Sequence, residues 1–186
     1  MAARMKPNAA PRAPLPAHPS PLVHQSTRFV LRFLIAWAVL SAGDFWARGV
    51  NAGLDRALAG LLGRTLPFLG VPSNVQGDTV AFTGGALQIG DPCNGLQLLE
   101  VLLAWLWACP ATWTSRGRAL LWMVPALAGL NLVRLYSLVP LTILRPEAVE
   151  PVHQYVWQVG MIGAVLAMGL LWMLKDGGHA LGRGRG

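Results

Sequence analysis

The chain has 186 residues, of which 54% are hydrophobic and only 12% are charged, and its formal net charge is +7. Soluble domains usually carry about 25% charged residues. This composition therefore excludes an ordinary soluble protein, including a soluble nucleic-acid-binding protein, despite the basic balance. Two cysteines are too few for a disulfide-stabilised scaffold. What remains is an integral membrane protein whose basic residues are concentrated in loops and tails.

The two ends of the chain differ from its centre. The first 27 residues include six prolines and three basic residues. Such a segment cannot bury enough apolar surface to fold, and it lacks the apolar core and cleavage site of a signal peptide. We predict a disordered cytoplasmic tail at 1–27, a membrane domain at 28–175, and a flexible, glycine-rich cytoplasmic tail at 176–186.

Three apolar segments are long enough to cross a hydrocarbon core of about 30 Å. They are residues 29–47, 119–141 and 153–174. A fourth segment, 95–109, is shorter and spans the membrane only if the residues just before it lie in the interface. Residues 54–70 place leucines at helical spacing, but charges interrupt them. That pattern favours an interfacial amphipathic helix over a span.

The basic residues orient these four spans. With the N-terminus inside, ten lysines and arginines lie in inside segments and four lie in outside segments, in agreement with the positive-inside rule. A fifth span at 54–70 would place either the basic N-terminal tail or Arg116 and Arg118 outside. We therefore expect residues 48–92 to form one large external segment.

The second half of this external segment, 75–90, alternates apolar and polar residues around a Gly84-Gly85 pair. Two glycines between alternating runs predict a β-hairpin. The expected fold class is an all-α integral membrane protein of about four transmembrane helices, with a short external amphipathic helix and a β-hairpin. The hairpin would lead the chain directly to the first cysteine.

Cys93 lies in an Asp-Pro-Cys-Asn-Gly run (91–95) at the outer end of the second span, whereas apolar residues flank Cys109. A helix N-terminus lowers the pKa of a thiol, so Cys93 is a candidate nucleophile. A small, unreactive residue would suit a helix start equally well. A disulfide with Cys109 is excluded, because sixteen residues of helix, about 24 Å, separate the two cysteines.

Two further residues are unusual for their positions. Arg134 lies inside the third span, where an arginine costs at least about 2.5–3.5 kcal/mol of insertion free energy, and it shares a helix face with Asn131 and Ser137. His153 opens the fourth span from outside and is the one histidine beyond the two tails. Taken singly, Arg134 could snorkel to the interface, and His153 could be an interfacial residue without a role.

Cys93, Arg134 and His153 come from three different spans, yet all three fall towards the outer side of the membrane. A nucleophilic thiol needs a base to take its proton and a positive charge to hold the thiolate. A guanidinium in a dry site can also stabilise the oxyanion of acyl transfer. Gln97 and Glu100 share the Cys93 face of the second span and could orient these groups. Glu100 could equally neutralise Arg134, which is the role we favour.

The Cys-Asn-Gly run at 93–95, the Asn131-x-x-Arg134 element and His153 resemble the exosortase/archaeosortase family of membrane cysteine transpeptidases. Their order and their placement on successive spans agree with that family, and the short chain resembles its compact exosortase H type. The resemblance covers about residues 29–174. It implies that the cysteine is the nucleophile and that the arginine and histidine are its partners. We assign substrate-binding or orienting roles to four neighbours: Asn94, Gln97, Glu100 and Asn131.

The resemblance implies that residues 28–175 form a cysteine-dependent peptidase and transpeptidase of the bacterial inner membrane, with its active site on the periplasmic side. Its partners besides the lipid bilayer would be exported proteins with a C-terminal sorting signal, made of a short motif, a transmembrane helix and a basic cluster. The enzyme would cleave near the motif and pass the acyl group to a cell-envelope acceptor. No nucleic-acid partner is implied. The sequence leaves open the substrate proteins, the acceptor and the oligomeric state.

Three other classes of membrane protein compete with this interpretation. A zinc hydrolase needs three or four ligands, and only Cys93 and His153, with Asp91 or Glu100, are available, so we expect no metal and no other cofactor. A small transporter or channel subunit could use Arg134 and Glu100 as an anion anchor and a proton relay, but no repeats or broken helices are evident. A purely structural protein would not explain Arg134 together with His153.

Overall fold

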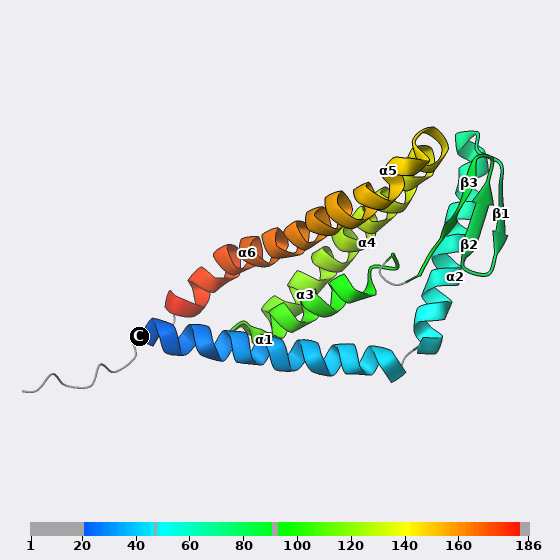
Figure 1. The fold of residues 1–186 in the computed structure, drawn as a ribbon. Helices are drawn as coiled ribbons and strands as arrows, with labels where there is room; N and C mark the ends of the chain where they lie inside the picture. The colour runs from blue at the N-terminus through cyan, green and yellow to red at the C-terminus, as the bar shows by residue number, and fades with distance from the viewer. Residues whose placement is uncertain (1–20, 47, 91–92, 183–186) are drawn as a thin grey trace, which may run out of the picture.

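The computed structural model describes residues 21–46, 48–90 and 93–182 (Figure 1). The helices are α1 (Pro21–Trp46), α2 (Arg48–Thr65), α3 (Leu96–Ala108), α4 (Trp113–Leu144), α5 (Pro146–Pro151) and α6 (Gln158–Gly182), with a 3-10 turn at Leu66–Leu69 and a π-helical turn at Val152–Trp157. The strands are β1 (Ser73–Gln76), β2 (Thr79–Phe82) and β3 (Gly85–Gln88). Helices α1, α3, α4 and α6 form a bundle, and α2 lies with the sheet at one end of it (Figure 1).

Three helical segments are long and apolar enough to cross a membrane: His24–Gly43, Trp113–Leu144 and Pro146–Lys175. The predicted fourth span corresponds to α3, an apolar helix of 13 residues. Such a helix is about 20 Å long, which is too short to cross a hydrocarbon core by itself. The structure therefore supports a multi-pass membrane protein with three candidate spans in the described residues and one shorter apolar helix beside them.

Two helix boundaries differ from the sequence prediction. Helix α1 begins at Pro21, inside the segment predicted as a disordered tail (1–27). Proline is tolerated in the first turn of a helix, because the amide hydrogen that it lacks would have no partner there. Helix α6 continues to Gly182, into the segment predicted as a flexible tail, and no proline interrupts it. The rest of both predicted tails lies outside the described residues.

The three strands form an antiparallel sheet in the order β1-β2-β3. The predicted hairpin is present as β2 and β3, with Phe82 opposite Gly85 and Gly84 in the turn at a φ of 97°. Glycine adopts this left-handed conformation without steric cost. The prediction of a hairpin alone was incomplete, because β1 adds a third strand. Strand β1 carries only one apolar residue, Val75, so its sequence gives little alternation to detect.

Helix α2 is the predicted amphipathic helix, but protein buries its apolar face. Ala59, Leu62 and Leu66 of this segment are buried in one cluster with Val80 and Phe82 of the sheet. Residues of α4 and the Cys93 turn complete the same cluster. The protein itself therefore buries part of that apolar face, while Leu61, Phe68 and Leu69 of the same segment stay exposed. Helix α2 and the sheet are thereby joined to the bundle beside the Cys93 turn.

The bundle has its own apolar cluster, formed by α3, α4 and α6, which includes Leu102, Met123 and Val165. Helix α1 packs on α3 through aromatic rings, with Phe29 edge-on to Trp105 at a centroid distance of 5.3 Å. The start of α1, the α3–α4 connection and the end of α6 lie together at one end of the bundle, and the sheet lies at the other (Figure 1). The Cys93 turn, which joins β3 to α3, therefore lies at the sheet end.

Candidate active site

The turn that carries Cys93 is held by its own neighbours. Gly95 has a φ of 81°, a left-handed conformation that favours glycine. The side-chain oxygen of Asn94 accepts the amide hydrogen of Leu96 at 2.9 Å, at the start of α3. Asn131 on α4 donates its Nδ2 hydrogen to the carbonyl oxygen of Cys93 at 3.0 Å. These contacts explain the Cys-Asn-Gly run and fix the thiol between α3 and α4.

His153 contacts the thiol from a third segment of the chain. It lies on the π-helical turn Val152–Trp157, which follows Pro151 and leads into α6. Such turns are rare in proteins, and those that do occur often lie at functional sites. The Nε2 atom of His153 lies 3.1 Å from the Sγ atom of Cys93, although sixty residues separate the two in the chain. The pair therefore has the geometry of a thiol and its base.

Arg134 completes the group from α4 and is only 2% exposed. One of its guanidinium nitrogens, Nη2, hydrogen-bonds to Nε2 of His153 and lies 3.8 Å from Sγ of Cys93. Because a guanidinium can only donate, Nε2 of His153 must accept this hydrogen bond. The contacts therefore assign the proton of a neutral imidazole to Nδ1. Cys93, Arg134 and His153, predicted from three separate segments, lie in mutual contact.

The environment of Cys93 changes the expected acidity of its thiol. Burial raises the pKa of Cys93 above its ordinary value, and the positive charge of Arg134 only partly opposes that effect. This corrects the expectation that the helix start would lower the pKa. The thiol is consequently protonated at neutral pH, so a reaction through the thiolate requires a base such as His153.

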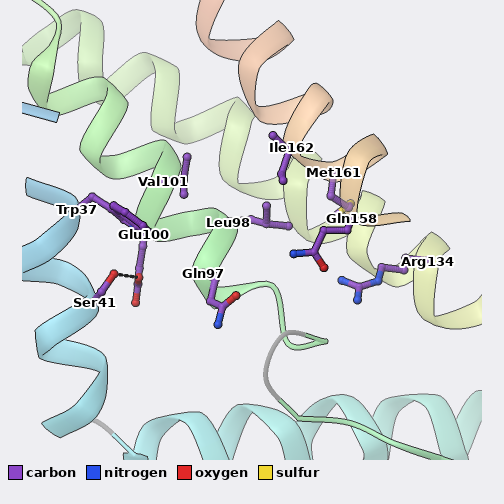
Figure 2. Close-up of a pocket in the computed structure, with 10 residues that line it drawn as sticks. All are labelled: Trp37, Ser41, Gln97, Leu98, Glu100, Val101, Arg134, Gln158, Met161 and Ile162. Atoms are coloured by element: carbon purple, nitrogen blue, oxygen red, sulfur yellow. Dashed lines mark hydrogen bonds between the residues drawn. The ribbon is translucent and has the colours of Figure 1, made fainter. Parts of the chain in front are cut away.

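A pocket of about 450 Å³ opens beside Arg134 (Figure 2). Its lining comes from four helices: Trp37 and Ser41 of α1, Gln97, Leu98, Glu100 and Val101 of α3, Arg134 of α4, and Gln158, Met161 and Ile162 of α6. Glu100 is buried and accepts a hydrogen bond from the Ser41 hydroxyl at 2.9 Å. Figure 2 shows Gln158 and Arg134 on one side of the pocket and Trp37, Ser41 and Glu100 on the other. Gln97 and Glu100 therefore line a pocket, whereas Asn94 and Asn131 hold the Cys93 turn.

A sequence model of the family described as transmembrane exosortase matches residues 23–174. The chain belongs to the transmembrane exosortase family. No curated protein and no solved structure matched the chain. As an exosortase, the chain is a multi-pass membrane protein of a family involved in processing sorting signals. The contact of Cys93 with His153 and Arg134 gives this exosortase a candidate catalytic group for that processing.

Two polar residues that line the pocket in this exosortase were not predicted from the sequence. Ser41 and Gln158 are polar residues within the predicted first and last spans, and this was the available signal. The remaining cysteine, Cys109, is buried at the far end of α3, where its carbonyl oxygen accepts a hydrogen bond from Arg116 at 2.9 Å. Within the part of the chain that the structure describes, no three His, Cys, Asp or Glu side chains are placed to hold a metal ion.

Proposed function

We propose that this chain is a membrane cysteine peptidase and transpeptidase that cleaves C-terminal sorting signals of exported proteins and transfers the proteins to a cell-envelope acceptor. The observation that carries the proposal is the mutual contact of Cys93, His153 and Arg134. Family membership supports the substrate class. In this proposal residues 28–175 are the transpeptidase domain of an inner-membrane protein, and the active site faces the periplasm.

The first step transfers a proton within the group. Nε2 of His153 takes the proton of the Cys93 thiol across 3.1 Å, leaving a thiolate and an imidazolium. The protonated Nε2 can no longer accept a hydrogen bond from Arg134. The guanidinium is then repelled by the imidazolium and attracted to the thiolate, which already lies 3.8 Å away. Arg134 thus exchanges one partner for the other as the nucleophile forms.

The second step forms the acyl-enzyme. The Cys93 thiolate attacks the carbonyl carbon of the scissile peptide bond, and the carbonyl oxygen becomes an oxyanion that Arg134 can stabilise by donating to it. When the tetrahedral intermediate collapses, the C–N bond breaks, and the Nε2 proton of His153 passes to the leaving amine. The substrate is then joined to Cys93 through a thioester, and His153 is again neutral.

The third step returns the enzyme to its resting state. The acceptor nucleophile gives its proton to His153 and attacks the thioester carbon. The C–S bond breaks, and the imidazolium proton returns to the Cys93 sulfur. A water molecule that takes the place of the acceptor gives hydrolysis instead. Asn94 and Asn131 orient the nucleophile in this scheme, and Gln97 and Glu100 contact the substrate.

The experiment that tests this function is co-expression with a candidate exported protein that carries a C-terminal sorting signal. Cleavage is followed by blotting and by the mass of the product. We expect cleavage with the wild-type chain and with Cys109→Ala, and none with Cys93→Ala at an equal protein level. Full cleavage by Cys93→Ala would contradict the proposal. A transporter that uses Arg134 and Glu100 is the alternative, and it requires no reactive cysteine.

A further inference from the structure

Half of the residues that line the pocket beside Arg134 are polar, although the pocket lies among apolar helices. Two carboxamides, Gln97 and Gln158, share it with the Ser41 hydroxyl, the Glu100 carboxylate and the Arg134 guanidinium (Figure 2). Polar and ionisable groups inside a membrane bundle are costly and usually serve a function. The position of this set beside the nucleophile suggests that it contacts the substrate.

The pocket also opens to the side. Trp37 of α1 and Ile162 of α6 both line it, and their exposed fractions are 43% and 47%. These two side chains come from two apolar helices that are candidate spans. The pocket therefore lies next to surface-exposed apolar side chains of both α1 and α6. A substrate segment anchored in the bilayer could enter it without leaving the membrane.

A transmembrane substrate helix that begins inside the membrane has backbone amide hydrogens that need acceptors. The first four amide hydrogens of any helix have no partner within that helix. In hydrocarbon no water can satisfy them, so protein groups must do so. The N-terminus of a helix also carries a partial positive charge, which a carboxylate stabilises. The start of a transmembrane helix held near Cys93 would need acceptors, and a negatively charged one would suit it best.

We propose that this pocket caps the N-terminus of the substrate's transmembrane helix, with Glu100 accepting amide hydrogens of its first turn. Gln97 and Gln158 would pair with the extended backbone between that turn and the scissile bond. The inference rests on the proposed function, because it takes the substrate to be a membrane-anchored peptide cleaved at Cys93. It assigns Glu100 a positioning role, in which Glu100 recognises backbone amides of the substrate and not its side chains.

The order of charges in the site agrees with this placement. Along the chain Cys93 comes first, Gln97 follows after four residues and Glu100 after seven. Arg134 lies against the thiol, where the carbonyl oxygen of the substrate gains negative charge. Glu100 lies about one turn further into α3 than Gln97, where the positive end of the substrate helix would be. The Ser41 hydroxyl holds the Glu100 carboxylate from α1, and a carboxylate can accept several hydrogen bonds at once.

The test uses the full chain and two substrates that differ at one position. One substrate has alanine at the N-cap position of its transmembrane helix, and the other has aspartate, which caps its own helix. We expect Glu100→Ala to process the alanine substrate about five- to tenfold less efficiently, chiefly through a higher KM, because one cap is lost. The aspartate substrate should restore Glu100→Ala to within about threefold of the wild-type chain. Glu147→Ala, which removes an exposed carboxylate on α5, is the control and should process both substrates normally.

Two results would overturn the inference. Equal losses on both substrates, with a fall in kcat, would show that Glu100 acts through Arg134. Normal processing of both substrates would show that Glu100 is not needed. Glu100→Gln keeps the shape and an acceptor oxygen but loses the charge, so it provides the same comparison if Glu100→Ala does not accumulate. In either case wild-type cleavage with a thioester at Cys93 would keep the proposed function intact, so the two proposals can fail separately.

Discussion

The Nε2 atom of His153 lies 3.1 Å from the sulfur of Cys93 and also accepts a hydrogen bond from Arg134. One nitrogen thus faces both a proton that it can take and a cation that can only donate. Its protonation breaks the contact with Arg134 and makes the thiolate the better partner for the guanidinium. This arrangement couples formation of the nucleophile to the placement of the positive charge that stabilises it.

The first prediction concerns the pH dependence of Cys93 alkylation. Burial raises the pKa of this thiol, so little thiolate is present at neutral pH, and its fraction grows as pH rises towards that pKa. In a Cys109→Ala chain, the rate of alkylation by iodoacetamide should increase about tenfold per unit between about pH 7 and pH 9. Arg134→Gln removes the charge that lowers this pKa and should move the curve to higher pH. A rate already constant at about pH 7 would contradict the prediction.

The second prediction concerns the chemistry of Arg134. If it only neutralised Glu100, lysine would serve almost as well, because both side chains carry one positive charge. A planar guanidinium can contact His153 and the thiol from one fork of donors, which an ammonium cannot reproduce. We expect Arg134→Lys to insert normally but to process substrate at least about a hundredfold more slowly. Adding Glu100→Gln should not restore the rate. Near-wild-type processing by Arg134→Lys would return this residue to a structural role.

The third prediction concerns Asn131, which donates a hydrogen bond to the Cys93 carbonyl at 3.0 Å. Asn131→Leu removes the donor and leaves a buried acceptor, which should lower the free energy of unfolding by about 1–3 kcal/mol. Processing should also slow, because the thiol loses its fixed position. Thermal unfolding in detergent and the cleavage assay measure the two effects. Ser137→Ala is the control, since that hydroxyl donates within its own helix. Asn131→Leu with unchanged stability and rate would oppose this role.

The fourth prediction concerns topology. The ten-to-four excess of basic residues predicts that the α3–α4 connection lies inside and the α4–α5 connection outside. In a chain without Cys93 and Cys109, an impermeant thiol reagent added to intact cells should label Arg145→Cys and should not label Thr114→Cys. Both positions are exposed, whereas the neighbouring Ser115 is buried and unsuitable as a probe. External labelling at Thr114→Cys would show that the orientation is wrong.

The catalytic candidates could be predicted from sequence because each one departs from its surroundings. Arg134 is a charge within an apolar span, His153 lies near the start of a span, and Cys93 lies in a polar turn. Hydropathy and length located the three candidate spans for the same reason, since a span needs a long apolar run. The unequal distribution of basic residues between inside and outside segments was enough to predict that the three residues lie on one side of the membrane. The sequence predicted only that the three residues share one side of the membrane; their mutual contact comes from the packing of the helices.

Other features could not be predicted, because they arise from tertiary packing. The raised pKa of Cys93 depends on its burial in a cluster with α2, the sheet and α4, and the helix start alone pointed to the opposite shift. The hydrogen bond between Ser41 and Glu100 joins residues 59 positions apart, so no local pattern indicates it. Strand β1, which contains Val75, forms through its pairing with β2, and its own sequence has too little alternation to predict it.

The most direct test of the central claim is to trap the acyl-enzyme. The purified chain is mixed with a cleavable substrate without an acceptor, quenched in acid, and digested for mass spectrometry. We predict that the peptide containing Cys93 gains the mass of the substrate fragment and loses it on treatment with hydroxylamine. The adduct and the cleavage should persist in Cys109→Ala and be absent from Cys93→Ala and Cys93→Ser. Processing at the wild-type rate by Cys93→Ala, or an equal loss in Cys109→Ala at normal protein levels, would contradict the assignment of Cys93 as the nucleophile.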